Sequence, residues 1–145
     1  GYKIYLYTVW WRDRKPAQRL YEKIGDKQHV YFDPQIYHYL DLLQILKQCY
    51  FTLNFKLHAN VLSAVANVPF IALGYRIKVF DFALSLGLQD FVLYTDDPHL
   101  SDKITTMISK QQTYQNILTS QMKKYLPIAR RNLTKPFSII QKTYC

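Results

Sequence analysis

An α/β fold built on a parallel sheet is predicted by three features of this sequence. Short runs rich in β-branched and aromatic residues alternate with segments of helical periodicity along most of the chain. The helical segments are about 10–15 residues long, the length that joins parallel strands. With 145 residues, of which 49% are hydrophobic, the chain can bury one core, so a single domain over residues 1–145 is expected.

The first part of the chain reads as strand, helix, strand and helix. The run Tyr2–Trp11 has the composition of a buried strand, and Arg12–Ile24 follows with apolar residues at helical spacing. His29–Phe32 is expected to form a second, short strand. Asp33 and Pro34 then predict a helix start, because Asp is a favoured N-cap and Pro suits the first helical position.

The middle of the chain repeats this alternation. Cys49–Phe55 is a third strand candidate, and Leu57–Val68 is a helix of small and apolar residues, which implies burial on several sides. Phe70–Gly74 makes a fourth strand, Val79–Leu86 a short helix, and Phe91–Tyr94 a fifth strand.

A long amphipathic helical region is expected over residues 100–126, and Pro127 and Pro136 are expected to break the helix beyond it. About five strands separated by helices predict right-handed crossovers and one parallel sheet with helices on both faces. The predicted fold is therefore a Rossmann-like, doubly wound domain with a long carboxyl-terminal helix.

The net charge of +9 is concentrated at the two ends of the chain. Residues 101–145 carry eight Lys and Arg against one Asp, whereas residues 31–100 carry four against six acidic residues. This distribution does not resemble a nucleic-acid reading surface, where basic and aromatic residues share one face. Two interpretations of the basic carboxyl-terminal region stay open, a solvated helix face and a contact with an anionic membrane or polyanion.

Several classes of protein are disfavoured by what the sequence lacks. No glycine-rich dinucleotide or P-loop motif is present, nor the Gly-x-Ser-x-Gly turn of the α/β-hydrolases. The four His do not fall at metal-ligand spacings, and Cys49 and Cys145 cannot form a disulfide framework. We therefore expect a cytoplasmic protein without a metal or bound cofactor.

Candidate binding residues lie where the third strand ends. In an open parallel sheet, ligands bind beyond the carboxyl ends of the strands, near the starts of helices. Asn54, Lys56 and His58 occupy this position, and they combine a cation, a titratable donor and the positive end of a helix. Such a group suits a small anion, although a solvated loop Lys and a His bonded to backbone would have the same sequence.

The fourth strand ends in a similar way. Gly74 is followed by Tyr75, Arg76 and Lys78, again at a junction between a strand and a helix. Two cations and a phenol there would face the same crevice as the preceding junction. An ordinary polar loop is the alternative interpretation.

These junctions resemble the polysaccharide pyruvyl transferase family. The family pattern has a Leu-His-Ala motif that opens a helix, a Val-Pro step into the next strand, and a Tyr-x-x-Lys followed by an aromatic residue. The corresponding residues here are Lys56-Leu57-His58-Ala59, Val68-Pro69, Tyr75 to Lys78 with Phe80, and Ser85-Leu86-Gly87-Leu88. The resemblance covers about residues 30–95.

The resemblance implies that this chain is the carboxyl-terminal half of a two-domain enzyme of the glycosyltransferase-B type. Such enzymes transfer the carboxyvinyl part of phosphoenolpyruvate to the hydroxyls of a surface polysaccharide as a ketal. By position, Lys56 and His58 would meet the donor phosphate and carboxylate, with His58 as general acid and Tyr75 and Lys78 as further candidates. The partners implied are phosphoenolpyruvate, a glycan acceptor and an amino-terminal domain.

The sequence departs from the family pattern at one informative position. Lys56 stands where the family usually has Arg, so it offers a point charge instead of a bidentate grip. This leaves open a different donor or lost activity. Two further alternatives are the nucleotide-sugar half of a glycosyltransferase, for which only Asp81 and Asp96 are available as ribose contacts, and a non-catalytic interaction domain.

Overall fold

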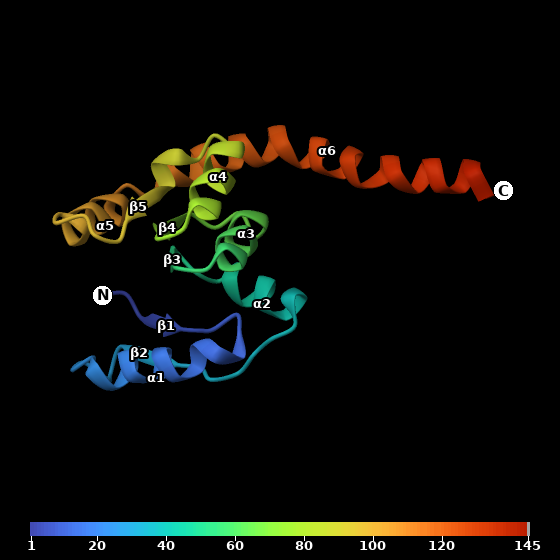
Figure 1. Ribbon diagram of the computed structural model, residues 1–145. Coiled ribbons are helices and arrows are strands. Elements are labelled where there is room, and N and C mark those ends of the chain that lie inside the picture. Colours follow the sequence, from blue (N-terminus) through green and yellow to red (C-terminus); the bar gives the residue numbers. More distant parts are fainter. Residues whose placement is uncertain (145) are drawn as a thin grey trace. The chain divides into compact units, whose positions relative to one another are not determined.

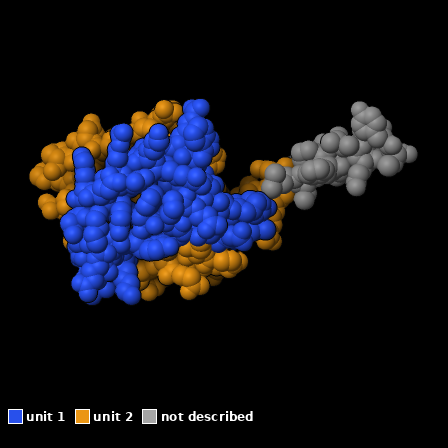
Figure 2. All heavy atoms as spheres, turned by 90° about the horizontal axis from the view of Figure 1, so that it is seen from below, with its two compact units in different colours: residues 1–42 blue, residues 43–145 orange. Residues whose placement is uncertain are grey.

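The computed structural model describes residues 1–144, with the side chains of residues 1–132. The chain divides into two compact units, Gly1–Leu42 and Leu43–Cys145 (Figure 2). The five strands of the described residues lie parallel to their neighbours, as predicted, but they form a two-stranded sheet and a three-stranded sheet instead of a single one. The architecture is therefore mixed α/β with parallel sheets.

The first unit is a strand–helix–strand arrangement. It contains β1 (Ile4–Leu6), the 3-10 turn η1 (Trp11–Asp13), α1 (Arg14–Lys23) and β2 (Val30–Phe32). Tyr5 and Tyr31 are register partners across the sheet, and their ring centroids lie 5.6 Å apart in a stacked arrangement. Tyr21 of α1 stacks on Phe32 of β2 with centroids 5.9 Å apart. Aromatic contacts thus join the elements of this unit.

Two expectations for the first unit are wrong. The buried strand expected over Tyr2–Trp11 shrinks to three residues, and Trp10 and Trp11 lie beyond its end with 44% and 62% of their surface exposed. The helix expected to start at Asp33 begins later, as α2 (Tyr39–Leu46). The Asp33 carboxylate instead accepts the backbone N–H of Gln35, so it closes a turn and does not cap a helix.

The second unit carries the predicted alternation almost unchanged (Figure 1). Its sheet has the order β3-β4-β5, with each strand parallel to the next. The elements are β3 (Thr52–Asn54), α3 (Leu57–Val65), β4 (Phe70–Gly74), α4 (Ile77–Ser85), the 3-10 turn η2 (Gln89–Phe91), β5 (Val92–Tyr94), α5 (Leu100–Ser109) and α6 (Gln111–Tyr144).

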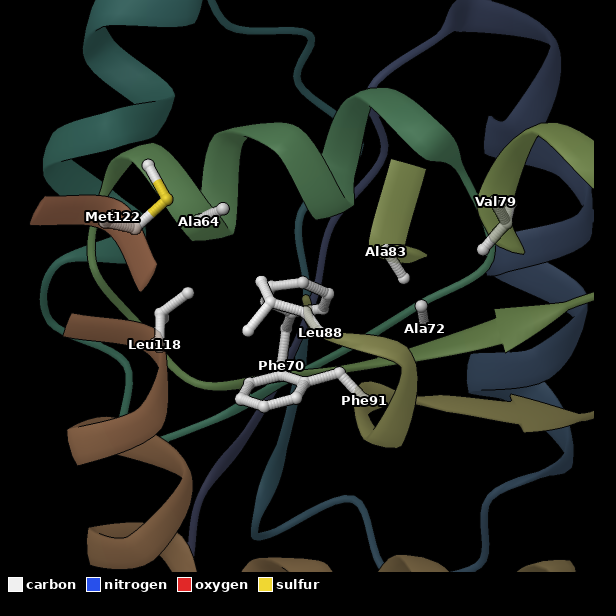
Figure 3. Packing of buried hydrophobic residues seen from close by; sticks show 9 residues of the cluster. All are labelled: Ala64, Phe70, Ala72, Val79, Ala83, Leu88, Phe91, Leu118 and Met122. Atoms are coloured by element: carbon white, nitrogen blue, oxygen red, sulfur yellow. The ribbon is translucent and has the colours of Figure 1, made fainter. Parts of the chain in front are cut away.

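Helices cover both faces of this sheet, because alternate residues of the central strand β4 point to opposite sides. Phe70 and Ala72 pack on one side with residues of α3, α4 and α6 (Figure 3). Ile71 and Leu73 pack on the other side with Met107 and its neighbours on α5. Burial of β4 on both faces explains why its sequence is a continuous apolar run.

The carboxyl-terminal region differs from the expectation of one helical region over residues 100–126. It forms two helices that meet at Lys110, and α6 continues past Pro127 and Pro136, where a break was expected. Pro127 removes one helix hydrogen bond, to the carbonyl of Lys123, a residue exposed to water. In the part of the chain that the structure describes, no helix is both long and apolar enough to cross a membrane.

The side chains of residues 133–145 lie outside the described part. They include Lys135, Lys142 and Cys145, on which the expectations for the basic region and the unpaired cysteine partly depend.

Candidate functional site

Two junctions between a strand and a helix lie side by side in the second unit. β3 ends at Asn54 and α3 begins at Leu57, while β4 ends at Gly74 and α4 begins at Ile77. Because β3 and β4 are parallel neighbours, both helices begin at the same edge of the sheet. The rings of Phe55 and Tyr75, one in each junction, confirm the proximity, since their centroids are 6.5 Å apart.

Each of these helices has a cation as its N-cap residue. Lys56 and Arg76 adopt extended backbone conformations just before α3 and α4. Their side chains carry donors only, so neither can accept a hydrogen bond from the first-turn N–H groups as Ser, Asp or Asn would. The first turns read Leu-His-Ala and Ile-Lys-Val, without a carboxylate. Both helix starts are therefore positive ends reinforced by a side-chain charge.

A second basic residue follows in each helix. His58 and Lys78 are both the second residue of their helices, and both are exposed. The two junctions thus share one order: an aromatic residue, a cation, an aliphatic residue and a basic residue. This correspondence was not detected in the sequence, where the two segments were interpreted separately.

Tyr75 contacts Arg76 at the second junction. The Arg76 guanidinium carbon lies 5.4 Å from the centroid of the Tyr75 ring, a cation–π arrangement. Tyr75 remains 44% exposed, so its ring and hydroxyl are accessible to a ligand. Lys56, at the first junction, is half-buried. The edge therefore presents a guanidinium that contacts an aromatic ring and the side chain of a half-buried lysine.

Asn54 differs from the other sequence candidates because its side chain is buried. Its Nδ2 donates to Thr52 Oγ1 at 3.1 Å and to Ser63 Oγ at 3.2 Å. Ser63 also accepts from Thr52 at 2.9 Å and donates to the carbonyl of Ala59 at 2.9 Å. This network ties the end of β3 to α3, so Asn54 orients the helix start on which Lys56 and His58 lie.

Two hollows in the surface of this unit lie away from this edge. One of about 160 Å³ and one of about 390 Å³ are lined by Ala64 and Val65 at the end of α3 and by Met122 and Leu126 of α6. The smaller hollow has an apolar lining, whereas the larger one also includes Asn67, Thr119, Lys123 and Arg130. Both flank the end of α3 opposite to Lys56. Neither hollow includes a residue of the two junctions.

A comparison with protein families assigns this chain to a family. A family model described as polysaccharide pyruvyl transferase matches residues 1–76, slightly more than half of the chain. The chain belongs to the polysaccharide pyruvyl transferase family. Comparison with curated proteins and with solved structures found no match.

The family match differs in extent from the resemblance seen in the motifs. It begins at residue 1 and so includes all of the first unit, whereas the motifs covered about residues 30–95. It includes the first junction and ends at Arg76, before Lys78. In this transferase family, the assignment of the chain to the carboxyl-terminal half of a two-domain enzyme stays a prediction.

Two groups of residues were not identified as candidates from the sequence. Trp10 and Trp11 are exposed, and the Arg12 guanidinium carbon lies 5.1 and 5.0 Å from their ring centroids. Asn60, in α3, is completely buried with an amide that finds no partner in the described part of the chain. For Trp10 and Trp11, the missing alternation of apolar and polar residues in the run that ends at Trp11 was the feature of the sequence that could have indicated their exposure. No feature of the sequence indicated the unpaired amide of Asn60.

Proposed function

We propose that this chain is the donor-binding part of a pyruvyl transferase that takes phosphoenolpyruvate as donor and a sugar of a surface polysaccharide as acceptor. The observation that carries the proposal is the pair of helix starts at one sheet edge, each with a cation at its N-cap. Membership in the polysaccharide pyruvyl transferase family supports the reaction type.

The two junctions suit the two anionic groups of phosphoenolpyruvate. Its phosphate and carboxylate are joined through one carbon, so they require two neighbouring sites of positive charge. The start of α3 with Lys56 and the start of α4 with Arg76 and Lys78 supply backbone donors and cations for both groups. In this proposal Tyr75 donates its hydroxyl to the same ligand.

The reaction requires protons to be delivered to the donor. Two acceptor hydroxyls form bonds to C2 of phosphoenolpyruvate, the bond from C2 to the phosphate oxygen breaks, and inorganic phosphate leaves. Of the two hydroxyl protons released, one is balanced by protonation of C3 to a methyl group and the other by protonation of the phosphate. His58 is the proposed general acid, because it lies exposed in the first turn of α3 beside the anion site.

A nucleotide-sugar site is the competing proposal for this edge. Its ribose would need a carboxylate, and the residues available are Asp81 on α4 and Asp96 after β5, both exposed. Asp81 lies in the second turn of α4, and Asp96 follows the neighbouring strand β5. Neither belongs to the first turns of α3 and α4, where the cations lie, and this placement supports a small dianionic donor.

This function is tested by thermal unfolding of the 145-residue chain with phosphoenolpyruvate, uridine diphosphate or inorganic phosphate. Phosphoenolpyruvate at about 100 times its Kd is expected to stabilise the chain by about 2.7 kcal/mol, and uridine diphosphate to stabilise it less. In Lys56→Ala and His58→Ala the shift with phosphoenolpyruvate should fall sharply. Lys110→Ala removes an exposed charge at the C-cap of α5 and should keep the full shift.

Two outcomes would contradict the proposal. A larger shift with uridine diphosphate than with phosphoenolpyruvate would indicate a nucleotide-sugar site. The absence of a shift with any of the anions, inorganic phosphate included, would favour a non-catalytic interaction domain.

A further inference from the structure

Asn60 is a buried polar residue that takes no part in the hydrogen-bond network of Thr52, Asn54 and Ser63. Its side chain is 0% exposed, and neither its Nδ2 nor its Oδ1 has a hydrogen-bond partner among the residues that the structure describes. Its neighbour Ser63, buried to the same extent on the same helix, makes three hydrogen bonds. Within α3, the unpaired buried polar side chain is therefore confined to Asn60.

The helix geometry places this amide near the start of α3. Asn60, Ser63 and Ala64 lie three and four residues apart, so they share one face of the helix. Ser63 contacts Asn54, the last residue of β3. Asn60 lies about 4.5 Å further along the helix axis, toward the helix start. Side chains on a helix also lean toward its N-terminus, so the amide lies on the side of the helix start where Lys56 precedes it by four residues.

An unpaired buried amide lowers the stability of the free protein. The group has lost its hydrogen bonds to water and has gained none within the chain. An aliphatic side chain of the same shape, such as Leu, would fill the space without this cost. Retention of an amide at such a place is the pattern expected where a ligand supplies the missing partner.

We propose that Asn60 is a ligand-binding residue whose Nδ2 donates a hydrogen bond to an oxygen of the anion held at the start of α3. The chemical class of this ligand is a small phosphate or carboxylate. Its identification as phosphoenolpyruvate rests on the function proposed above, whereas the binding of an anion by Asn60 does not. Asn60 acts together with the Lys56 charge and the first-turn N–H groups of α3, which are donors of the same kind.

The test compares two replacements of Asn60 with a matched control. Asn60→Leu preserves the shape of the side chain, and Asn60→Ala removes the amide without any risk of overpacking. Asn116→Leu makes the same chemical change at an exposed position of α6. For each protein, the melting temperature without ligand and the Kd values for inorganic phosphate, pyruvate and phosphoenolpyruvate are measured.

Asn60→Leu is expected to melt at a higher temperature than the unmodified chain when no ligand is present. Both Asn60 variants should bind the anion about tenfold more weakly, the effect of one hydrogen bond to a charged group. The Asn116→Leu protein should match the unmodified chain in both measurements. A weakened Kd for phosphate but not for pyruvate would assign Asn60 to the phosphate end of the donor, and the reverse to the carboxylate end.

The failure of this inference can be distinguished from that of the proposed function. If the unmodified chain binds phosphoenolpyruvate and both Asn60 variants bind it equally well, the role of Asn60 is wrong and the function stands. If inorganic phosphate binds in an Asn60-dependent manner but phosphoenolpyruvate binds no better than phosphate, the donor is wrong and the role of Asn60 stands. An Asn60→Leu protein that melts at a lower temperature and binds anions normally would overturn the inference.

Discussion

Asp33 is a buried carboxylate that accepts hydrogen bonds from two phenols and one backbone amide. The hydroxyls of Tyr5 and Tyr37 both donate to its Oδ2, at 2.5 and 2.6 Å, and the N–H of Gln35 donates to its Oδ1 at 2.8 Å. This cluster joins β1, the end of β2 and the turn after β2 within the first unit. Asp33 thus stabilises a turn at the position where the sequence indicated the start of a helix.

The same hydrogen bonds set the protonation of the cluster. Burial favours the neutral acid, but the bonds from Tyr37, Tyr5 and Gln35 outweigh it and hold the pKa of Asp33 below its ordinary value. Burial together with the bond to Asp33 raises the pKa of Tyr5, and the bond to Asp33 raises that of Tyr37. At neutral pH the cluster therefore consists of one carboxylate and two neutral phenols.

This cluster should make part of the stability depend on acid pH. A depressed pKa in the folded state stabilises the protein above the unfolded value, near 3.9, and this contribution is lost as the pH falls through the folded pKa. Tyr37→Phe removes one bond to the carboxylate, so the pKa of Asp33 should rise and acid unfolding should begin at higher pH. Acid titration followed by circular dichroism measures the midpoint.

The control for this prediction is Tyr94→Phe, which removes an exposed hydroxyl on β5. Its acid midpoint should equal that of the unmodified chain. Equal midpoints for Tyr37→Phe and the unmodified chain would show that the phenol does not stabilise the carboxylate.

The contact between β4 and α4 is closer than a side chain at Gly74 would permit. A Cβ at this position would lie 2.3 Å from Cζ of Phe80 and 2.9 Å from Cγ1 of Val92. Phe80, on α4, also packs against Tyr94 of β5 with ring centroids 4.8 Å apart. The absence of a side chain at the end of β4 thus allows α4 to begin directly over the sheet edge, where Arg76 and Lys78 lie.

Gly74→Ala should therefore destabilise the chain by about 1–3 kcal/mol, the usual range for overpacking. Urea unfolding measures the difference in the free energy of unfolding. Gly25→Ala provides the control, because a Cβ there would meet nothing within 4 Å. The double variant Gly74→Ala with Phe80→Ala should lose less than the sum of the two single changes, since the second change makes room for the first. Additive losses would contradict the close contact.

Helix ends are the features that were hardest to predict at the scale of elements. α3 was expected to run to Val68, but it ends at Val65, and Asn67 adopts a left-handed conformation with φ of 56°. The side chain of Asn67 also accepts a hydrogen bond from Thr119 of α6 at 3.1 Å. A partner 52 residues away in sequence thus contributes to the end of this helix, and the periodicity of the local sequence cannot indicate such a contact.

At the scale of the whole chain, the two sheets lie in separate compact units, and every candidate for donor binding lies in the second. These candidates lie at the edge formed by the starts of α3 and α4, and all of them suit an anion. The family match includes all of the first unit and part of the second, since it runs from residue 1 to residue 76. The family match thus includes a large part of the chain, the first unit among it, that lies outside the candidate site.

We predict that the 145-residue chain binds phosphoenolpyruvate without catalysing its transfer. The proposed groups hold and protonate the donor, whereas the resemblance assigns the acceptor hydroxyls to another domain. Phosphate release is measured with phosphoenolpyruvate in the presence and absence of a glycan acceptor, and the thermal shift with phosphoenolpyruvate shows that the site is intact. Sustained, acceptor-dependent release would contradict this prediction.

The sequence alone was sufficient for the alternation of strands and helices, the parallel sheets and the family. These features depend on local composition and periodicity, as in the apolar run of β4, and on short motifs such as Lys56-Leu57-His58-Ala59. Residues that follow parallel strands lie at a common edge of the sheet. On this ground the sequence also indicated five candidate binding residues: Lys56, His58, Tyr75, Arg76 and Lys78.

Tertiary structure decided the features that depend on contacts between distant residues. The division into two sheets follows from which strands pair, and the exposure of Trp10 and Trp11 follows from where β1 loses its partner. The buried role of Asn54 and the unpaired amide of Asn60 became visible only when α3 was placed on β3. Burial and hydrogen bonding are properties of the packed chain, so a sequence read locally cannot distinguish a buried amide from an exposed one.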